Sequence, residues 1–498
     1  MMDEQSFVTM ENYDKRYAYG ILAILSALVL IVMYIEGMLT PSLPSIAQSF
    51  GVNVAQVSLV LSAYLVTGVA LSPIVGKMGD LLGKKKIMTA VLIIYAVCVS
   101  ITGFSPDFYF MVIARAFQGI GITILPLGMS IMREQFPRDM IPKSQAFLSA
   151  MFGVGFAISL PLGAFISNDY GWRMTYHTSI PFIIILTIIS VLYIKESRFR
   201  RPEVKIDFTG SAILAISLAM IVIALSEGSL WGWTSTLFLS VIFTGFIFLI
   251  PMYIYEKRYL KNGGEPVFDF PLLKERNVMV PNFVLALSGL GMFLAMQALS
   301  YRFETPKPYG FGLDILDTGL SLVPFALGLI FLAPITARAS IRFGVKPVAV
   351  IGSVVTAIGF LFESSVSTFY VSLVYEFFIG AGLSILNASV INLLILTVSS
   401  KNMALATSMN STFRSLGSTL GAPIAGAVLS AFTISVVVSG NHIFSFPDNT
   451  SYHIVFVISS VVFLIAAVIN MMGREVLGKR KYVGTGIKNP IETQSQQI

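Results

Sequence analysis

The chain has 498 residues, of which 55% are hydrophobic and only 12% are charged, and its mean hydropathy is +0.81. Soluble domains carry about 25% charged residues, so the composition excludes a soluble globular protein. The formal net charge of +7 does not indicate nucleic-acid binding, because the basic residues cluster between long apolar runs. One cysteine and three scattered histidines give neither a disulfide framework nor a metal-binding cluster.

Residues 1–17 are expected to form a short cytoplasmic tail that is not a cleaved leader. Four acidic residues precede Lys15 and Arg16, so the basic segment that opens a signal peptide is missing. The apolar run that follows is also too long for the core of a signal peptide. This first run is therefore expected to stay in the protein as a membrane anchor.

Fourteen apolar runs are predicted to cross the bilayer as helices, since one span needs roughly 20 residues. They are 18–40, 54–75, 87–105, 108–130, 145–167, 178–195, 208–227, 236–255, 279–300, 317–337, 347–364, 369–395, 403–435 and 452–473. An even number places both termini on one side. If that side is the cytoplasm, 28 of the 33 lysines and arginines lie in cytoplasmic segments. The positive-inside rule therefore predicts a multi-pass cell-membrane protein with both termini cytoplasmic.

An internal repeat relates the two halves of the chain. Residues 73–125 and 334–386 align without a gap, with 12 identities in 53 positions. The identities include Gly83/Gly344, Phe108/Phe369 and Gly119/Gly380. This register maps the fourth helix onto the twelfth, so two six-helix halves flank an extra helix pair. Parallel six-helix repeats are typical of alternating-access carriers with a site near the midplane.

The predicted fold is therefore an all-α integral membrane protein. Residues 18–196 form the first six-helix bundle, and residues 197–277 form a linker that carries the two inserted helices. Residues 278–473 form the second bundle, and residues 474–498 are a cytoplasmic tail.

A short cationic loop joins the second and third predicted helices. It spans residues 76–86, and the residues that we expect to shape it are Gly76, Asp80, Gly83, Lys84 and Lys85. Two readings are open, an ordinary positive-inside loop and the gating hinge of a transporter.

Together with other motifs, this loop resembles the major facilitator superfamily, specifically its fourteen-helix drug:proton antiporter branch. The other motifs are Arg115 with residues 118–121, Gly171-Trp172-Arg173, residues 207–210, residues 231–233, and residues 318–320 through Pro334. The resemblance covers roughly residues 18–473 and implies a secondary transporter. It also implies that Asp80 latches the two halves together, for instance through Arg133; the alternative is a solvated loop acid.

Arg115 and Glu36 are the predicted coupling pair. Arg115 lies about 10 Å along its helix from the outer end, where a charge costs a few kcal/mol unless it is paired or faces a wet cavity. Glu36 lies at nearly the same depth in the first helix. Protonation of Glu36 would release Arg115, and deprotonation would restore the pair. The alternative for Arg115 is a purely structural ion pair, and the alternative for Glu36 is a position at the membrane interface, where it reaches the lipid headgroups.

Three further polar residues are candidates for the cavity. Glu376 is the repeat counterpart of Arg115, so the halves would carry opposite charges and favour cationic substrates; structural pairing is an equal alternative. Gln297 is the repeat counterpart of Glu36. Arg414 lies in the thirteenth predicted helix, or at the cytoplasmic interface if that helix starts late.

Small residues and prolines in the fourth, fifth and thirteenth predicted helices are expected to allow close packing and kinks. They are Gly119, Gly121, Gly155, Pro161, Gly163, Gly417, Gly421 and Pro423. The fifth-helix pattern resembles the exporter signature of the family in a degraded form.

The resemblance implies a monomer that exports amphipathic, cationic or neutral drugs in exchange for protons, with membrane lipid as its surroundings. No cofactor is expected, and the absence of a Walker-type loop argues against ATP as the driving force. An enzyme is not expected, because no nucleophile–base or metal constellation is present. Two alternatives stay open: a carrier for a specific metabolite, and a membrane receptor or scaffold that transports nothing.

Overall fold

The computed structural model describes residues 15–137, 140–196, 200, 203, 205–398, 403–438 and 442–476. Residues 1–14 and 477–498, which make up most of the two expected tails, lie outside the described residues. Nearly all of the described chain is helical.

The elements follow in chain order. They are α1 (Lys15–Gly37), η2 (Thr40–Ser42), α2 (Leu43–Phe50), α3 (Val54–Leu82), α4 (Lys84–Gly103), α5 (Phe108–Gln118), η3 (Gly119–Thr123), α6 (Ile124–Gln135), α7 (Ile141–Tyr170), α8 (Trp172–Tyr193), α9 (Phe208–Trp231), α10 (Thr236–Ile247), α11 (Leu249–Lys261), α12 (Phe270–Leu273), α13 (Arg276–Glu304), α14 (Ile315–Ser321), α15 (Val323–Phe343), α16 (Val345–Ser364), α17 (Phe369–Thr397), α18 (Met403–Ala431), β1 (Thr433–Val438), β2 (His442–Pro447) and α19 (Asn449–Met472).

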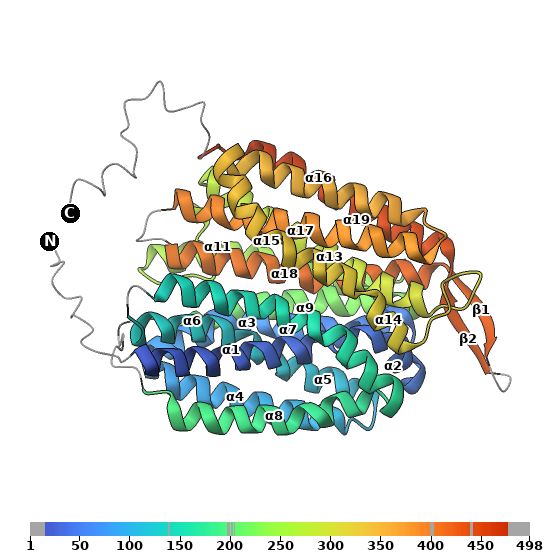
Figure 1. Cartoon of the computed structure of the whole chain (residues 1–498), viewed down its shortest axis with the longest axis horizontal. Coiled ribbons are helices and arrows are strands. Elements are labelled where there is room, and N and C mark those ends of the chain that lie inside the picture. The colour runs from blue at the N-terminus through green and yellow to red at the C-terminus, as the bar shows by residue number, and fades with distance from the viewer. Residues whose placement is uncertain are drawn as a thin grey trace.

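The long helices run roughly parallel to one axis, with the first half of the chain on one side and the second half on the other (Figure 1). The antiparallel strands β1 and β2 project from one end, which we call the hairpin end (Figure 1). The loop of residues 76–86 lies at the opposite end, which we call the basic end.

Twelve helical segments of the described chain are long and apolar enough to cross a membrane, by length and composition. Helices α7 and α18, with 30 and 29 residues, complete a set of fourteen long segments that match the fourteen predicted runs in order. The count of fourteen spans stays a prediction. Large apolar side chains are exposed on the outer helices, for example Ile93 on α4, Ile188 on α8 and Phe243 on α10. An apolar exterior of this kind suits a lipid environment.

The repeat seen in the sequence recurs in the helix boundaries. Helix α4 and helix α16 both have 20 residues and begin at equivalent positions, Lys84 and Val345. Helices α5 and α17 likewise begin at the equivalent residues Phe108 and Phe369. The two halves therefore place equivalent residues at equivalent depths.

The structure differs from the predicted spans in four places, one of which is the tenth span, divided at Leu322 between α14 and α15. The predicted thirteenth helix ends at Ala431, because the β-branched run from Thr433 to Val438 pairs with β2 as a hairpin. The fourth is interrupted by the 3-10 turn η3, which begins at Gly119. The eighth is broken at Phe248, three residues before Pro251, whose missing N–H cannot continue the helical ladder.

Candidate functional site

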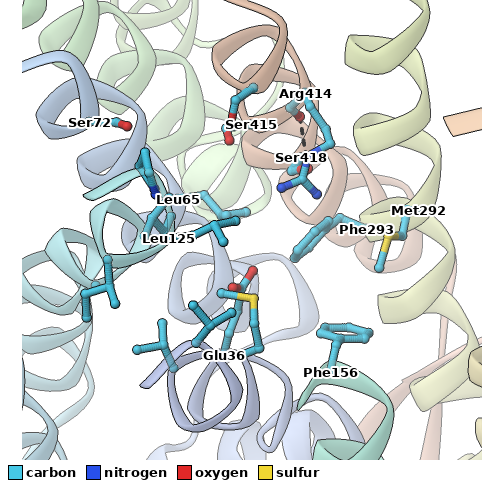
Figure 2. A pocket seen from close by; sticks show the side chains of 18 residues that line it. Glu36, Leu65, Ser72, Leu125, Phe156, Met292, Phe293, Arg414, Ser415 and Ser418 are labelled. Atoms are coloured by element: carbon cyan, nitrogen blue, oxygen red, sulfur yellow. Dashed lines mark hydrogen bonds between the residues drawn. The ribbon is translucent and has the colours of Figure 1, made fainter. Parts of the chain in front are cut away.

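A cavity with about 50 Å³ of space for the centres of water molecules lies between the two halves of the chain. Its lining comes from α1, α3, η3, α6 and α7 on one side and from α13 and α18 on the other. The lining residues are Val29, Val32, Met33, Glu36, Leu65, Ser72, Gly121, Ile122, Ile124, Leu125, Pro126, Phe156, Met292, Phe293, Ser411, Arg414, Ser415 and Ser418. Figure 2 shows these side chains converging on one space. The walls are mainly apolar, which suits an amphipathic ligand.

Two opposite charges face this cavity from different halves. Glu36 on α1 points its carboxylate into the space, and the guanidinium of Arg414 on α18 points toward it from the other side (Figure 2). Glu36 interacts electrostatically with both Arg414 and Arg115, and the attraction of Arg414 is the larger. The cavity therefore holds an acid and a base whose separation depends on how the two halves are placed.

Close helix packing sets the direction in which Glu36 points. A Cβ at Gly37 would lie 2.1 Å from Ser159 Oγ of α7, and one at Gly155 would lie 2.7 Å from the carbonyl oxygen of Leu30. Helices α1 and α7 are thus in contact along this face. Glu36 lies about 100° around α1 from Gly37, on the adjacent face that lines the cavity together with Val29 and Val32.

Arg115 lies behind the cavity wall and does not pair with Glu36 as predicted. It is fully buried, and its Nε donates to the carbonyl oxygen of Val60 at 3.0 Å. Its Nη1 donates to Gln118 Oε1 at 3.0 Å, and the guanidinium lies 4.9 Å from the centre of the Tyr64 ring. The predicted contact is absent from the ion pairs of the described residues, because Val60, Gln118 and Tyr64 hold the guanidinium within the first half, although its Nη2 has no hydrogen-bond partner there.

Gln297 and Glu376 are also outside the cavity lining of the described residues. The side-chain amide of Gln297 donates to the carbonyl oxygen of Val54 at 3.1 Å, which joins the two halves near the hairpin end. Glu376 is fully buried inside the second half. Neither residue lines this cavity in this conformation, and their role in transport stays a prediction.

The loop at the basic end holds a charge network inside the first half. Lys84 pairs with Asp80 at 3.3 Å and also pairs with Glu134 of α6. Arg133, which we predicted as the partner of Asp80, is exposed. Its neighbour Glu134 faces Lys84, and adjacent residues of a helix point about 100° apart, so Arg133 is turned away from the network. In this conformation the ion pair of Asp80 therefore stabilises the first half and does not cross to the second.

Two glutamates that the sequence analysis did not select hold this loop and its repeat counterpart. Glu196 accepts from the backbone N–H groups of Lys85 and Lys86 at 3.2 and 3.1 Å. Glu475 accepts from those of Val345 and Lys346 at 3.0 and 2.9 Å. A carboxylate at a helix N-terminus satisfies free donors and the helix dipole. One sequence feature could have identified these two glutamates. A basic residue followed by a glutamate comes after the last helix of each half, as Lys195-Glu196 and as Arg474-Glu475.

Gly83 makes this contact possible. Its φ of +113° is one that side chains rarely adopt, and a Cβ there would lie 2.6 Å from Glu196 Oε1. Gly344, its counterpart, has a φ of +97°. Gly76, in contrast, has no atom within 4 Å of its Cβ position, so the structure gives no packing reason for a glycine there.

Replacing Lys84 by methionine is expected to destabilise the basic end by about 1–2 kcal/mol. This cost lies between that of losing an exposed ion pair and that of breaking a fully buried one. The substitution leaves Asp80 and Glu134 close together without their shared cation. Thermal unfolding of the purified protein in detergent measures the effect. Lys86→Met removes the same charge from an exposed side chain of the same loop and should change the unfolding temperature little. Equal shifts in the two variants would contradict the network.

The remaining glycines of the predicted set lie where helices touch. Their would-be Cβ atoms approach neighbouring helices to between 1.7 and 2.6 Å at Gly119, Gly121, Gly163, Gly417 and Gly421. Pro161 and Pro423 lie inside α7 and α18.

Two helical bundles that enclose a central cavity, with an acid and a base on opposite walls, define the architecture of a secondary carrier. The Major Facilitator Superfamily profile matches residues 25–300 and 282–486. The chain therefore belongs to the Major Facilitator Superfamily, a family of transporters.

Relatives of this chain include proteins named for drugs and for a vitamin. The multidrug transporter protein MdtP of Bacillus subtilis is 25% identical over 398 residues, 78% of this chain and 71% of that protein. The riboflavin transporter RibZ of Clostridioides difficile is 22% identical over 382 residues, 76% and 81% of the two chains. The crystal structure of a bacterial homologue of the human lysosomal transporter Spinster, in an inward-facing and unoccupied conformation, is similar with a TM-score of 0.67. The two sequences are 13% identical, and the match covers 92% of this chain and 97% of that one.

Proposed function

We propose that this protein is a proton-coupled exporter of amphipathic compounds, working by alternating access as a monomer in the cell membrane. The single observation that carries this proposal is the cavity between the halves, with apolar walls, Glu36 on one side and Arg414 on the other. Similarity to multidrug transporters such as MdtP supports the drug-like class of substrate.

The geometry supports a simple exchange cycle. An ionised Glu36 in an apolar wall is stabilised by Arg414 or by a cationic substrate, whereas a protonated Glu36 needs neither. Arrival of a proton at Glu36 would therefore favour release of a cationic substrate. Separation of the two halves would weaken the attraction of Arg414 for Glu36, so the proton and the arrangement of the halves are linked.

We place the basic end in the cytoplasm, as the distribution of lysine and arginine requires under the positive-inside rule. The hairpin end then faces outward. It is closed in this conformation where Gln297 bonds to Val54 and where the Cβ position of Gly319 lies 2.7 Å from the carbonyl oxygen of Leu160.

Reconstitution into liposomes with a pH-sensitive dye in the lumen tests the exchange. Addition of a lipophilic cationic dye such as ethidium is expected to cause proton movement that empty liposomes do not show. A pH difference of one unit is about 1.4 kcal/mol per proton, so each proton exchanged for a dye molecule should contribute about a tenfold factor to the dye ratio that is sustained. Dye movement that ignores an imposed pH difference would contradict proton coupling.

A second candidate, carriage of one specific metabolite, is favoured by the similarity to the riboflavin transporter RibZ. The same liposomes distinguish the two functions. Saturable uptake of riboflavin, with no response to several unrelated cationic dyes, would favour the specific carrier.

A further inference from the structure

A second group of buried charges lies inside the second half, apart from the cavity. Arg302 near the end of α13 donates from Nη1 to the carbonyl oxygen of Glu363 at 2.7 Å and pairs with its carboxylate Oε1 at 3.3 Å. Arg302 also donates to the carbonyl oxygen of Val366. Ser372 of α17 donates to Glu363 Oε1 at 2.7 Å. Arg302, Glu363 and Glu376 form what we call the buried acid cluster, and none of them lines the cavity.

Glu376 is the exceptional member of the buried acid cluster. Its side chain is fully buried, and both carboxylate oxygens lack a hydrogen-bond partner in the described structure. Burial of an ionised, unpaired carboxylate is prohibitively costly in an apolar interior, and such a group takes up a proton instead. Neither oxygen is compensated by Arg302, whose ion pair is with Glu363.

The charge balance of the cluster leads to the same conclusion. Two carboxyl groups and one guanidinium are buried together, and the ionised groups that act on Glu376 are Glu363 and Arg302. From α19, Tyr452 acts on Arg302, and His453 Nδ1 lies 3.2 Å from the carbonyl oxygen of Ser364. One cation balances one carboxylate, so the second carboxyl group requires a proton for the cluster to be neutral.

Comparison of the two halves shows that this arrangement belongs to the second half. At the repeat positions of Glu376 and Glu363, the first half has Arg115 and Thr102. There, Gln118 bridges the two by accepting from Arg115 and donating to Thr102 Oγ1 at 2.6 Å. The first half therefore has a cation held by neutral partners, where the second half has two acids that share one cation.

The cluster also has a direction. Glu363 is the last residue but one of α16, close to the hairpin end, whereas Glu376 lies about 10 Å along α17 from that end. A proton that enters from the hairpin end thus meets Glu363 before Glu376. Since Glu363 is held by Arg302, transfer of the proton to Glu363 would release Arg302 to pair with Glu376.

We infer that Arg302, Glu363 and Glu376 form a second proton-binding site, outside the substrate cavity, in which one proton is shared between two carboxyl groups. In this conformation Glu376 holds that proton. During the transport cycle Glu376 gives it up to water, which leaves two carboxylates, and Arg302 then lies between them as their shared cation. This inference deepens the proposed function, since it adds a second coupled proton to the one at Glu36.

Infrared spectroscopy of the purified protein in lipid nanodiscs tests the shared proton without any substrate. A buried carboxylic acid gives a C=O stretching band that is separate from the amide bands. We expect this band in the wild type at neutral pH, and other buried acids can also contribute to it, namely Glu36, Glu256 and Glu304. Glu376→Gln should therefore reduce the band by the share of one carboxylic acid. We expect the same reduction in Glu363→Gln, because Arg302 would then be free to pair with Glu376 and ionise it. An unchanged band in either variant would overturn the shared-proton site.

A matched control and a transport measurement complete the test. Glu227→Gln removes another buried acid of the described chain, one that accepts from Tyr109 and Gln56 and does not contact Arg302; it should leave the cluster's band in place. In liposomes, Glu376→Gln is expected to lower the number of protons moved per dye molecule by one. An unchanged number would overturn the second coupled proton. If the wild type moves no protons, the proposed exchange fails, while the infrared result still decides whether the cluster shares a proton.

Discussion

Glu36→Gln is expected to abolish dye-evoked proton movement in liposomes, a loss of at least tenfold in the initial rate. Glutamine has nearly the same shape as glutamic acid and mimics its protonated form, so α1 should still pack against α7. The variant cannot release a proton, however, and one half of the charge pair across the cavity is gone. Dye that still crosses the membrane should be coupled to at most the one proton of the buried acid cluster.

The control for this prediction is Glu265→Gln. Glu265 is exposed at the basic end, and its backbone carbonyl, not its side chain, accepts from Lys77. This substitution removes one acid from the protein and should leave proton movement within twofold of the wild type. Normal proton movement in Glu36→Gln would refute the role of Glu36 and would direct attention to the buried acid cluster.

A double-mutant cycle identifies the arginine that works with Glu36. Residues that share an interaction show non-additive effects. The strongest electrostatic partner of Glu36 is Arg414, so Glu36→Gln and Arg414→Gln should together cost little more than the larger single effect. The combination of Glu36→Gln with Arg115→Gln should be closer to additive, because Arg115 is held by Val60 and Gln118.

Gly417→Val is expected to prevent folding of the second half. A Cβ at Gly417 would lie 1.7 Å from the carbonyl oxygen of Ala286 and 2.6 Å from its carbonyl carbon. Both atoms belong to the backbone of α13, so no side-chain rotation relieves the clash. Helices α13 and α18 would have to separate, and their contact extends to Gly289 and Gly421. A cost above about 4 kcal/mol is characteristic of such overpacking at a backbone contact.

Size-exclusion chromatography of the solubilised protein, followed by thermal unfolding, measures this effect. We expect the monodisperse peak of the wild type to be lost in Gly417→Val. Gly20→Ala is the matched control, since Gly20 lies within helix α1 and has no atom within 4 Å of its Cβ position. That substitution should leave stability unchanged or raise it by up to about 1 kcal/mol, through helix propensity. A monodisperse Gly417→Val protein with wild-type stability would show that the contact between α13 and α18 is looser than described.

The pattern of hydrophobic runs was sufficient to predict most of the fold. Apolar length fixes where a helix can cross a bilayer, since every backbone group must be satisfied within the segment. The repeat predicted equivalent helix starts at Phe108 and Phe369, and these are found. Interruptions within spans were missed, because η3 depends on contacts between helices that hydropathy does not encode. The β1–β2 hairpin was missed because an apolar β-branched run also continues a membrane helix in sequence alone.

The polar site was predicted by residue type but not by partner. Glu36, Arg115, Glu376 and Arg414 were all selected because charge inside an apolar run is costly and must have a reason. Which of them meet depends on helix rotation and on how the halves are placed. Those quantities placed Glu36 and Arg414 on facing walls of the cavity, left Arg115 bound within the first half, and assigned Glu376 to a separate cluster with Glu363.

The sequence by itself thus determined a membrane-embedded, two-fold repeated helical protein with a small set of buried charges, because hydropathy and repetition are properties of the chain alone. Only the tertiary structure decided which charges face one another. A rotation of a helix by one residue, about 100°, moves a side chain from a cavity to a neighbouring helix, and no pattern along the chain specifies that angle.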